Sequence, residues 1–172
     1  MHRATGAPIA PAVPLAPLDS ARDVHAFDVP IDATDGWAKY NRHYWLDHYQ
    51  DFLEFFFSQC FPEPHSTKPV EDSVGWGLET SPEVLLAEND VPWVDEATLR
   101  AWCAASRCPV LVVHGTKDRI SPLRRGRALA GATGGDLVVL EGAGHIPMAR
   151  DPVKVNLLIR EFVDSLAQGR RP

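Results

Sequence analysis

The feature of this sequence that most constrains the fold is a pair of short apolar runs, each followed by a helical pattern. The first run extends from Pro109 to Val113, and the second extends from Asp136 to Leu140. Such runs, rich in β-branched residues, are typical of parallel strands that are buried on both faces. The order strand, helix, strand, helix predicts a crossover unit of a parallel sheet. Two strands do not form a stable sheet of this kind alone, so we expect more of the sheet elsewhere.

The helices of this region have clear boundary signals. Ser121, which precedes a proline, predicts the start of the helix between the two runs, and Gly131 and Gly134 predict its end. Asp151, which also precedes a proline, predicts the start of the last helix. One face of that helix has an apolar stripe at helical spacing, formed by Val155, Leu158, Ile159, Phe162, Val163 and Leu166.

The stretch 37–107 is predicted to be all-helical. Its first part has aromatic residues at three- and four-residue steps, which predicts one helix over 37–56 with a broad aromatic face: Trp37, Tyr40, Tyr44, Trp45, Tyr49, Phe52, Phe55 and Phe56. Core packing explains such a stripe, and the helix can also cover a pocket. Further helix starts are predicted at Ser66 or Thr67, at Ser81 and at Asp95. Before this stretch, Ala7 to Leu15 predicts one extended segment, which its prolines confine to a sheet edge or a strand end.

Composition excludes several function classes. The chain has 172 residues, which fits one domain, and a net charge of -6, which argues against a partner such as a nucleic acid or an anionic membrane. No apolar run approaches the ~20 residues of a membrane span. The opening stretch lacks the pattern of a signal peptide, and Cys60, Cys103 and Cys108 include no CxxC pair. We therefore expect a cytoplasmic protein.

Reactive side chains follow both predicted strands. Asp118 comes shortly after the first strand, and His145 comes shortly after the second. Functional groups of parallel sheets collect beyond the carboxyl ends of the strands, so these two side chains are predicted to meet. A carboxylate beside an imidazole fixes the ring tautomer and stabilises the imidazolium formed when the histidine acts as a base. Alternatively, Asp118 is a turn residue that helps to cap the next helix, and His145 is a core histidine. His114 is predicted to be a packing or turn residue rather than a second base.

The segments PVLVVHGTKDRISP and VVLEGAGHIPMARDPVKVN resemble the last two core strands of the α/β-hydrolase family. The resemblance covers about residues 108–165 and implies that Asp118 is the acid and His145 the general base. It also implies a partial α/β-hydrolase fold, in which a helical cap precedes the last two parallel strands and helices of the core sheet. On this interpretation residues 1–30 are the remnant of a core strand with a linker, 31–107 are the cap, and 108–172 are the C-terminal core segment.

One part of the family pattern is missing. Nothing before Asp118 fits the G-x-S-x-G elbow that holds the nucleophile, whether Ser, Cys or Asp is at its centre. Gly131 and Gly135 flank Thr133, but they follow the acid and lie in a predicted helix-ending loop. The residues that form an oxyanion hole are missing with the elbow. We expect either a truncated or mis-started hydrolase, one half of a split hydrolase, or a non-catalytic binding or interaction module.

The resemblance implies hydrolysis through a covalent intermediate, with an ester or similar small acyl substrate. Epoxide and carbon–halogen chemistry are alternatives, because those relatives differ mainly at the missing nucleophile. The expected partners are a small apolar or acyl substrate and the missing N-terminal hydrolase half, with no metal or organic cofactor. The residues predicted to contact substrate are Trp45, Tyr49, His65 and Ile146. A metal site of His43, Asp47 and His48 is disfavoured, because His48 lies on another face of the predicted helix.

Overall fold

The computed structural model describes residues 5–18 and 26–169 of the chain. Parts of the predicted segments 1–30 and 108–172 lie outside these described residues. The chain divides into two compact units. Residues Met1–Pro17 and Val94–Pro172 form the first, which we term the sheet unit, and Leu18–Trp93 form the second, which we term the helical unit.

The centre of the sheet unit is a parallel strand pair. β1 (Leu111–Gly115) and β2 (Asp136–Leu140) are joined through α6 (Leu123–Thr133), and Leu111 lies opposite Asp136 in their register. The predicted strand–helix–strand unit is confirmed, although β1 begins two residues after Pro109. On the other edge of β1, Gly6 and Ile9 form isolated parallel bridges to Val110 and Val113. Ile9 lies in the segment Ala7 to Leu15 that was predicted to be extended, and Gly6 lies directly before this segment.

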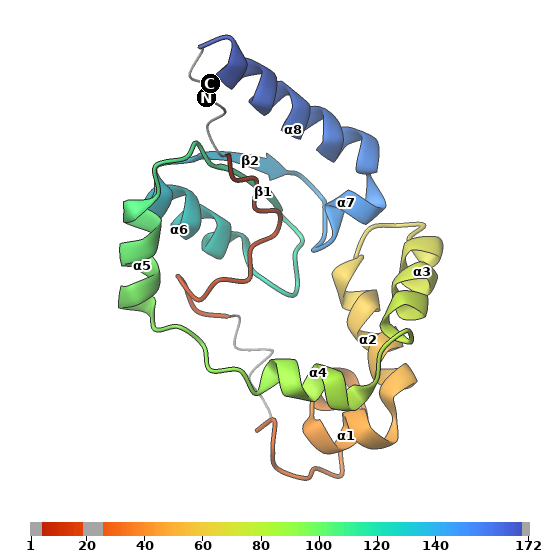
Figure 1. Ribbon diagram of the computed structural model, residues 1–172. Coiled ribbons are helices and arrows are strands. Elements are labelled where there is room, and N and C mark those ends of the chain that lie inside the picture. Colours follow the sequence, from red (N-terminus) through yellow and green to blue (C-terminus); the bar gives the residue numbers. More distant parts are fainter. Residues whose placement is uncertain (1–4, 19–25, 170–172) are drawn as a thin grey trace. The chain divides into compact units, whose positions relative to one another are not determined.

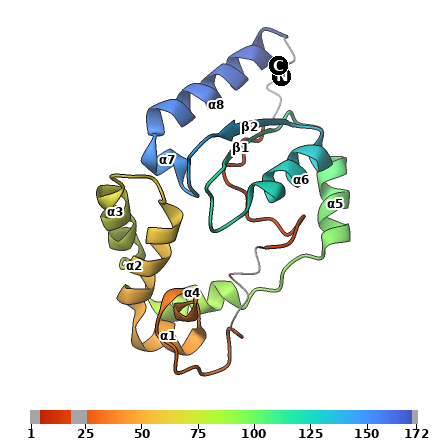
Figure 2. The ribbon, with the colours of Figure 1, turned by 180° about the vertical axis from the view of Figure 1, so that it is seen from behind.

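Helices cover both faces of this sheet. α5 (Glu96–Ala105) and α6 lie on one face, and α8 (Pro152–Ala167) lies on the other, preceded by the short α7 (Pro147–Arg150), as Figure 1 and the reverse view in Figure 2 agree. Strand side chains alternate between the two faces. Val112 packs with Leu129 on the α6 face, while Val113 packs with Val155 and Phe162 on the α8 face.

β2 is less buried than its apolar run predicts. Val138 and Leu140 pack in the cluster that includes α8, and Leu137 packs in the cluster that includes α6. Asp136 and Val139 are exposed, with 40% of Val139 accessible to solvent. The prediction of a fully buried strand was therefore wrong for β2, because α6 covers Leu137 on its face of the strand but leaves Val139 uncovered.

The boundaries of the helices in the sheet unit follow local chemistry. Asp95 caps α5 by accepting a hydrogen bond from the Thr98 N–H, as predicted, and Asp151 caps α8. α6 starts after Pro122 rather than after Ser121, whose hydroxyl instead donates to the Pro11 carbonyl at 2.7 Å. At its other end α6 continues through Gly131 to Thr133. In the apolar stripe of α8, Val155 and Phe162 are buried, whereas 45% of Val163 is exposed.

The helical unit contains a 3-10 turn (Gly36–Lys39) and four helices, α1 (Arg42–Asp47), α2 (Tyr49–Cys60), α3 (Thr67–Gly77) and α4 (Pro82–Asn89), within the part of the chain that the structure describes. Ser66 and Ser81 precede α3 and α4, as predicted. The single helix predicted over 37–56 was wrong, because the chain leaves the helical conformation at Tyr40–Asn41 and again at His48. The aromatic side chains nevertheless converge, and Trp45 lies 4.6 Å from Phe52 between ring centroids.

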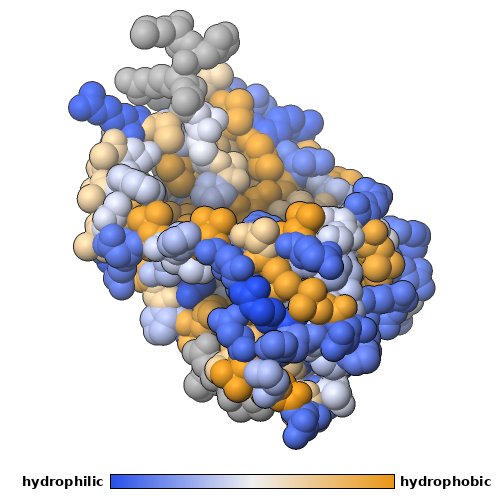
Figure 3. All heavy atoms as spheres, turned by 60° about the horizontal axis from the view of Figure 1, so that its bottom comes forward, coloured by the Kyte–Doolittle hydropathy of each residue, from blue (hydrophilic) through white to orange (hydrophobic). Residues whose placement is uncertain are grey.

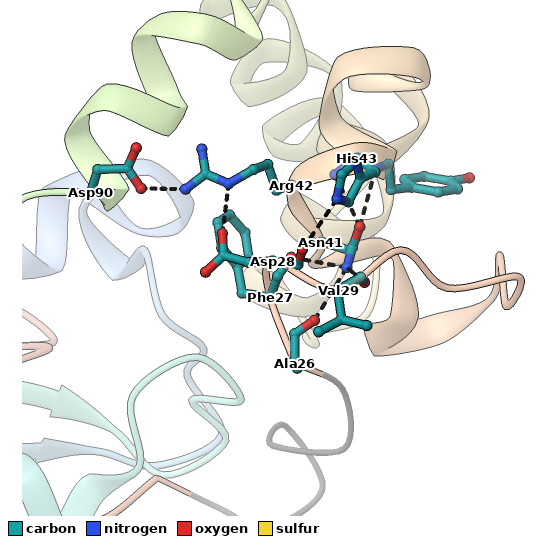
Figure 4. A network of polar contacts seen from close by, with 9 residues as sticks. Ala26, Phe27, Asp28, Val29, Asn41, Arg42, His43 and Asp90 are labelled. Carbon is teal, nitrogen blue, oxygen red and sulfur yellow. Dashed lines mark hydrogen bonds and ion pairs between the residues drawn. The ribbon is translucent and has the colours of Figure 1, made fainter.

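A polar network attaches residues 26–29 to the start of α1 (Figure 4). The Asn41 side-chain amide donates to the carbonyls of Ala26, Phe27 and Val29 at 3.3, 2.9 and 2.8 Å. Its oxygen accepts from two backbone N–H groups in the first turn of α1. Arg42 beside it pairs with Asp28 at 2.6 Å and with Asp90. One buried amide therefore caps a helix and fixes a neighbouring loop.

The surface is mixed in character. On the face that Figure 3 shows, apolar residues alternate with polar ones. Exposed apolar residues occur in both units, among them Trp76 and Trp102. Among the described helices, none is both long and apolar enough to cross a membrane.

Candidate active site

The loops after β1 and β2 are joined by backbone and hydroxyl hydrogen bonds. The Thr116 N–H donates to the Leu140 carbonyl at 3.0 Å, and the Lys117 N–H donates to the Ala143 carbonyl at 2.9 Å. The Thr116 hydroxyl oxygen accepts from the Gly142 N–H at 2.9 Å. The two loops thus extend the parallel pairing beyond the strands and hold Asp118 and His145 on neighbouring segments.

Asp118 and His145 form a hydrogen bond at the ends of these loops. His145 Nδ1 lies 2.8 Å from Asp118 Oδ2. The carboxylate is buried, whereas the imidazole retains 20% of its accessible surface. A carboxylate only accepts hydrogen bonds, so Nδ1 carries the proton and Nε2, on the opposite side of the ring, is left as the basic nitrogen. The geometry is that of a base oriented by an acid.

The second oxygen of Asp118 is used within its own loop. Oδ1 accepts hydrogen bonds from the N–H groups of Ile120 and Ser121, each at 2.8 Å. This is the pattern of a turn-forming aspartate. The turn role and the pairing with His145 are therefore compatible, because each uses a different carboxylate oxygen.

Asp118 is held in the ionised form. Burial raises the pKa of this carboxyl group, but hydrogen bonds from His114 and His145 and from the Ser121 backbone outweigh burial and lower the pKa to about 2. At neutral pH the carboxylate is negative and available to stabilise an imidazolium at His145.

His114 also contacts Asp118, which the sequence analysis missed. Its imidazole is completely buried, and Nε2 lies 2.7 Å from the Ser121 carbonyl oxygen and 3.2 Å from Asp118 Oδ2. The residue is a packing and turn residue, as predicted, with this added contact. The sequence does contain the signal, because His114 lies at the end of β1, four residues before the acid.

The four residues predicted to contact substrate lie in different surroundings. Trp45 is 1% exposed among Phe27, Tyr40 and Phe52, so it is a core residue and offers no surface to a ligand. Tyr49 is partly buried, which raises the pKa of its phenol, and its hydroxyl donates to the Gly77 carbonyl.

The other two residues predicted to contact substrate lie in loops. His65 is exposed in the loop before α3, and Ile146 is partly buried directly before α7.

The metal site that the sequence disfavours includes His43. The His43 ring nitrogen Nε2 lies 3.2 Å from the Asp28 carbonyl oxygen. Within residues 5–18 and 26–169, no three or more His, Cys, Asp or Glu side chains are arranged to hold a metal ion.

Solved structures share the fold that positions these residues. An esterase from Rhodococcus sp. superimposes with a TM-score of 0.60 and 24% identity, over 68% of this chain and 42% of that chain. A bromoperoxidase from Bacillus anthracis superimposes with a TM-score of 0.62 and 15% identity, over 90% of this chain and 57% of that chain. These proteins have the α/β-hydrolase fold. This chain has part of the α/β-hydrolase fold.

Curated sequences match this chain over a shorter region, and one of them is named as an AB hydrolase superfamily protein. An AB hydrolase superfamily protein from Bacillus subtilis is 37% identical over 68 residues, which are 39% of this chain and 25% of that protein. An uncharacterized protein from Mycobacterium tuberculosis is 36% identical over 58 residues, which are 33% of this chain and 17% of that protein. No family model matches the chain. The matches thus span a quarter or less of these curated relatives, and about half of the solved structures with the α/β-hydrolase fold.

Proposed function

We propose that this chain supplies the general base and the acid of a hydrolase that acts on esters or similar small acyl substrates. The observation that carries the proposal is the hydrogen bond between His145 Nδ1 and Asp118 Oδ2, at the carboxyl ends of adjacent parallel strands. An esterase among the structural neighbours supports the choice of substrate class.

The proposed chemistry follows from the two hydrogen-bonded groups. His145 Nε2 takes the proton of a hydroxyl nucleophile as that oxygen attacks the acyl carbon, and it then returns the proton to the leaving group. In the second half of the cycle the same nitrogen takes a proton from a water molecule as the water oxygen attacks the acyl carbon. It returns this proton to the nucleophile oxygen as the acyl–enzyme bond breaks, which releases the acid product and restores the nucleophile. Asp118 keeps His145 in the required tautomer and stabilises the imidazolium in both halves.

The nucleophile is the remaining component. The sequence contains no G-x-S-x-G elbow. We therefore propose that the nucleophile and the oxyanion-hole donors come from polypeptide outside this sequence, either in a longer form of the protein or in a separate chain. A serine there gives the acyl chemistry above, whereas an aspartate gives epoxide or carbon–halogen hydrolysis by the same histidine.

The test begins with the reading frame upstream of Met1. We expect it to encode a nucleophile elbow, and we expect the longer protein to hydrolyse p-nitrophenyl butyrate and react with a fluorophosphonate probe. In that protein His145→Gln lowers kcat by about a thousandfold or more, and exposed His48→Gln leaves kcat unchanged. If the frame is closed, the same assays apply to mixtures with an elbow-bearing chain encoded beside it. If the protein with His145→Gln hydrolyses the ester as fast as the wild type, the proposal is contradicted. It is also contradicted if neither the longer protein nor the mixture of two chains hydrolyses the ester or reacts with the probe, and the chain is then a non-catalytic module.

A further inference from the structure

We propose that His114 is a positioning residue, whose single Nε2–H group fixes the loop that presents Asp118 to His145. The inference rests on the proposed function, because it gives His114 a task only if the Asp118–His145 pair takes part in catalysis. It assigns to a buried side chain a role that extends beyond packing.

The contacts of Nε2 define the role. The Ser121 carbonyl oxygen is 2.7 Å away, and Asp118 Oδ2 is 3.2 Å away. Both atoms only accept hydrogen bonds, so Nε2 carries a proton that the two acceptors share. A side chain at the end of β1 thereby holds the far end of the loop, just before α6.

This hydrogen bond acts on both oxygens of the carboxylate. Oδ1 is held by the N–H groups of Ile120 and Ser121, and the carbonyl of Ser121 is in turn held by His114. Oδ2 is held by His114 and His145. His114 therefore limits the rotation of the Asp118 carboxylate in two ways. It contacts Oδ2 directly, and it holds Ser121, whose N–H group donates to Oδ1.

The other ring nitrogen shows why packing alone does not explain a histidine here. His114 Nδ1 is buried, and no residue in the described part of the chain forms a hydrogen bond with it. It faces Gly126 of α6, where a Cβ atom would overlap the ring. A buried polar atom without a partner costs free energy, which leucine or phenylalanine at this position would avoid. None of the described residues offers an acceptor at Nδ1, whereas two acceptors lie at Nε2, so the geometry places the ring proton on Nε2.

The wild-type chain provides the first test. Long-range 1H–15N NMR spectra of the 15N-labelled protein at neutral pH, assigned with His114→Gln and His145→Gln, report the tautomer of each ring. We expect the proton on Nε2 in His114 and on Nδ1 in His145. A proton on Nδ1 of His114 overturns the present inference. A neutral His145 without a proton on Nδ1 overturns the proposed function instead, so the two failures are distinguishable.

Matched variants provide the second test. His114→Gln keeps an N–H group near the position of Nε2, whereas His114→Leu keeps only apolar volume. We expect the His145 Nδ1 proton to exchange with water about tenfold faster in His114→Leu, and His114→Gln to restore most of the protection. Exposed His48→Leu is the control and leaves the signal unchanged.

The outcomes separate positioning from general stability. Unchanged His145 signals in a folded His114→Leu variant overturn the inference. Equal loss of protection in folded His114→Gln and His114→Leu also overturns it, because restoring the donor then restores nothing. If His114→Leu does not fold, two measurements still decide the question. These are the ring tautomers in the wild type and the exchange rate of the His145 Nδ1 proton in His114→Gln, because both depend on a donor at the position of Nε2.

Discussion

Gly115 lies so close to Ala143 that a Cβ atom on the glycine would overlap the alanine carbonyl group. Gly115 ends β1, and Ala143 lies in the loop that leads to His145. The same carbonyl oxygen accepts the hydrogen bond from the Lys117 N–H. The absence of a side chain at one position thus permits the acid loop and the histidine loop to approach each other.

The first prediction concerns this approach. Gly115→Ala must separate the two loops, so we expect a loss of about 2 kcal/mol in the free energy of unfolding and a weaker His145–Asp118 hydrogen bond. Urea unfolding measures the former, and the NMR signal of the His145 Nδ1 proton measures the latter. Gly131→Ala is the control, because Gly131 lies in α6 with open space around it, and alanine there should stabilise the chain by about 1 kcal/mol. An unchanged His145 signal in Gly115→Ala contradicts the role given to this glycine.

The second prediction concerns acid unfolding. The pKa of Asp118 is about 2 in the folded chain, against an ordinary value of 3.8. The unfolded chain therefore binds a proton at this carboxyl first, and acid favours unfolding. The stabilisation is present above pH about 4 and is lost as pH falls towards about 2, with a total of about 2 kcal/mol. Free energies of unfolding measured across this range should fall by about 2 kcal/mol more in the wild type than in Asp118→Asn.

Other carboxylates titrate in the same pH range. The quantity to compare is therefore the difference in the free energy of unfolding between the wild type and Asp118→Asn. Hydrogen bonds lower the pKa of Asp51, chiefly from Lys39, and those of Glu83 and Asp95 as well. These exposed groups contribute equally to the wild type and to Asp118→Asn. A difference that stays constant from pH 5 to pH 2 would mean that Asp118 is not held as the structure indicates.

The third prediction concerns Asn41, whose side chain joins residues 26–29 to the start of α1 in the helical unit. Asn41→Asp keeps an oxygen for the cap of α1 but turns a negative charge towards three backbone carbonyls. We expect a loss of about 2 kcal/mol or more, because a buried donor is replaced by an unpaired charge. Thermal or urea unfolding measures the loss, with the exposed Asn156→Asp in α8 as the control. Equal stability of the two variants would show that the amide donors contribute nothing.

The sequence predicted the sheet unit well because its signals are local. The apolar runs, the cap at Asp151 and the order of elements each depend on neighbouring residues, and they place Asp118 and His145 after adjacent strands. Parallel pairing then brings the two loops together without further information. The residues that form the turn around Asp118 lie within four sequence positions of it, so this part of the candidate site could also be predicted from the sequence.

The predictions that failed depend on contacts distant in sequence. Asn41 starts a new helix because its amide also fits the carbonyls of residues 26–29, a fit that aromatic periodicity does not reveal. Val139 is exposed although the neighbouring Leu137 and Leu140 pack against other elements, and which strand residues are covered depends on those distant elements. The contact of His114 with Asp118 depends on the path of the loop to Ser121 and on the close packing of α6.

The fourth prediction follows from that packing. Alanine at a glycine in a helix normally stabilises it by about 1 kcal/mol. At Gly126 the added Cβ would overlap the His114 ring, so Gly126→Ala should instead cost about 2 kcal/mol. In a His114→Ala background the ring is gone, and only a tight contact of 3.2 Å with the Cβ of residue 114 remains. There Gly126→Ala should be neutral or stabilising. A double-mutant cycle measured by urea unfolding gives the coupling free energy of the pair, which we expect to be about 2 kcal/mol. A coupling near zero would mean that the ring does not lie against α6, and the single tautomer of His114 would lose its structural basis.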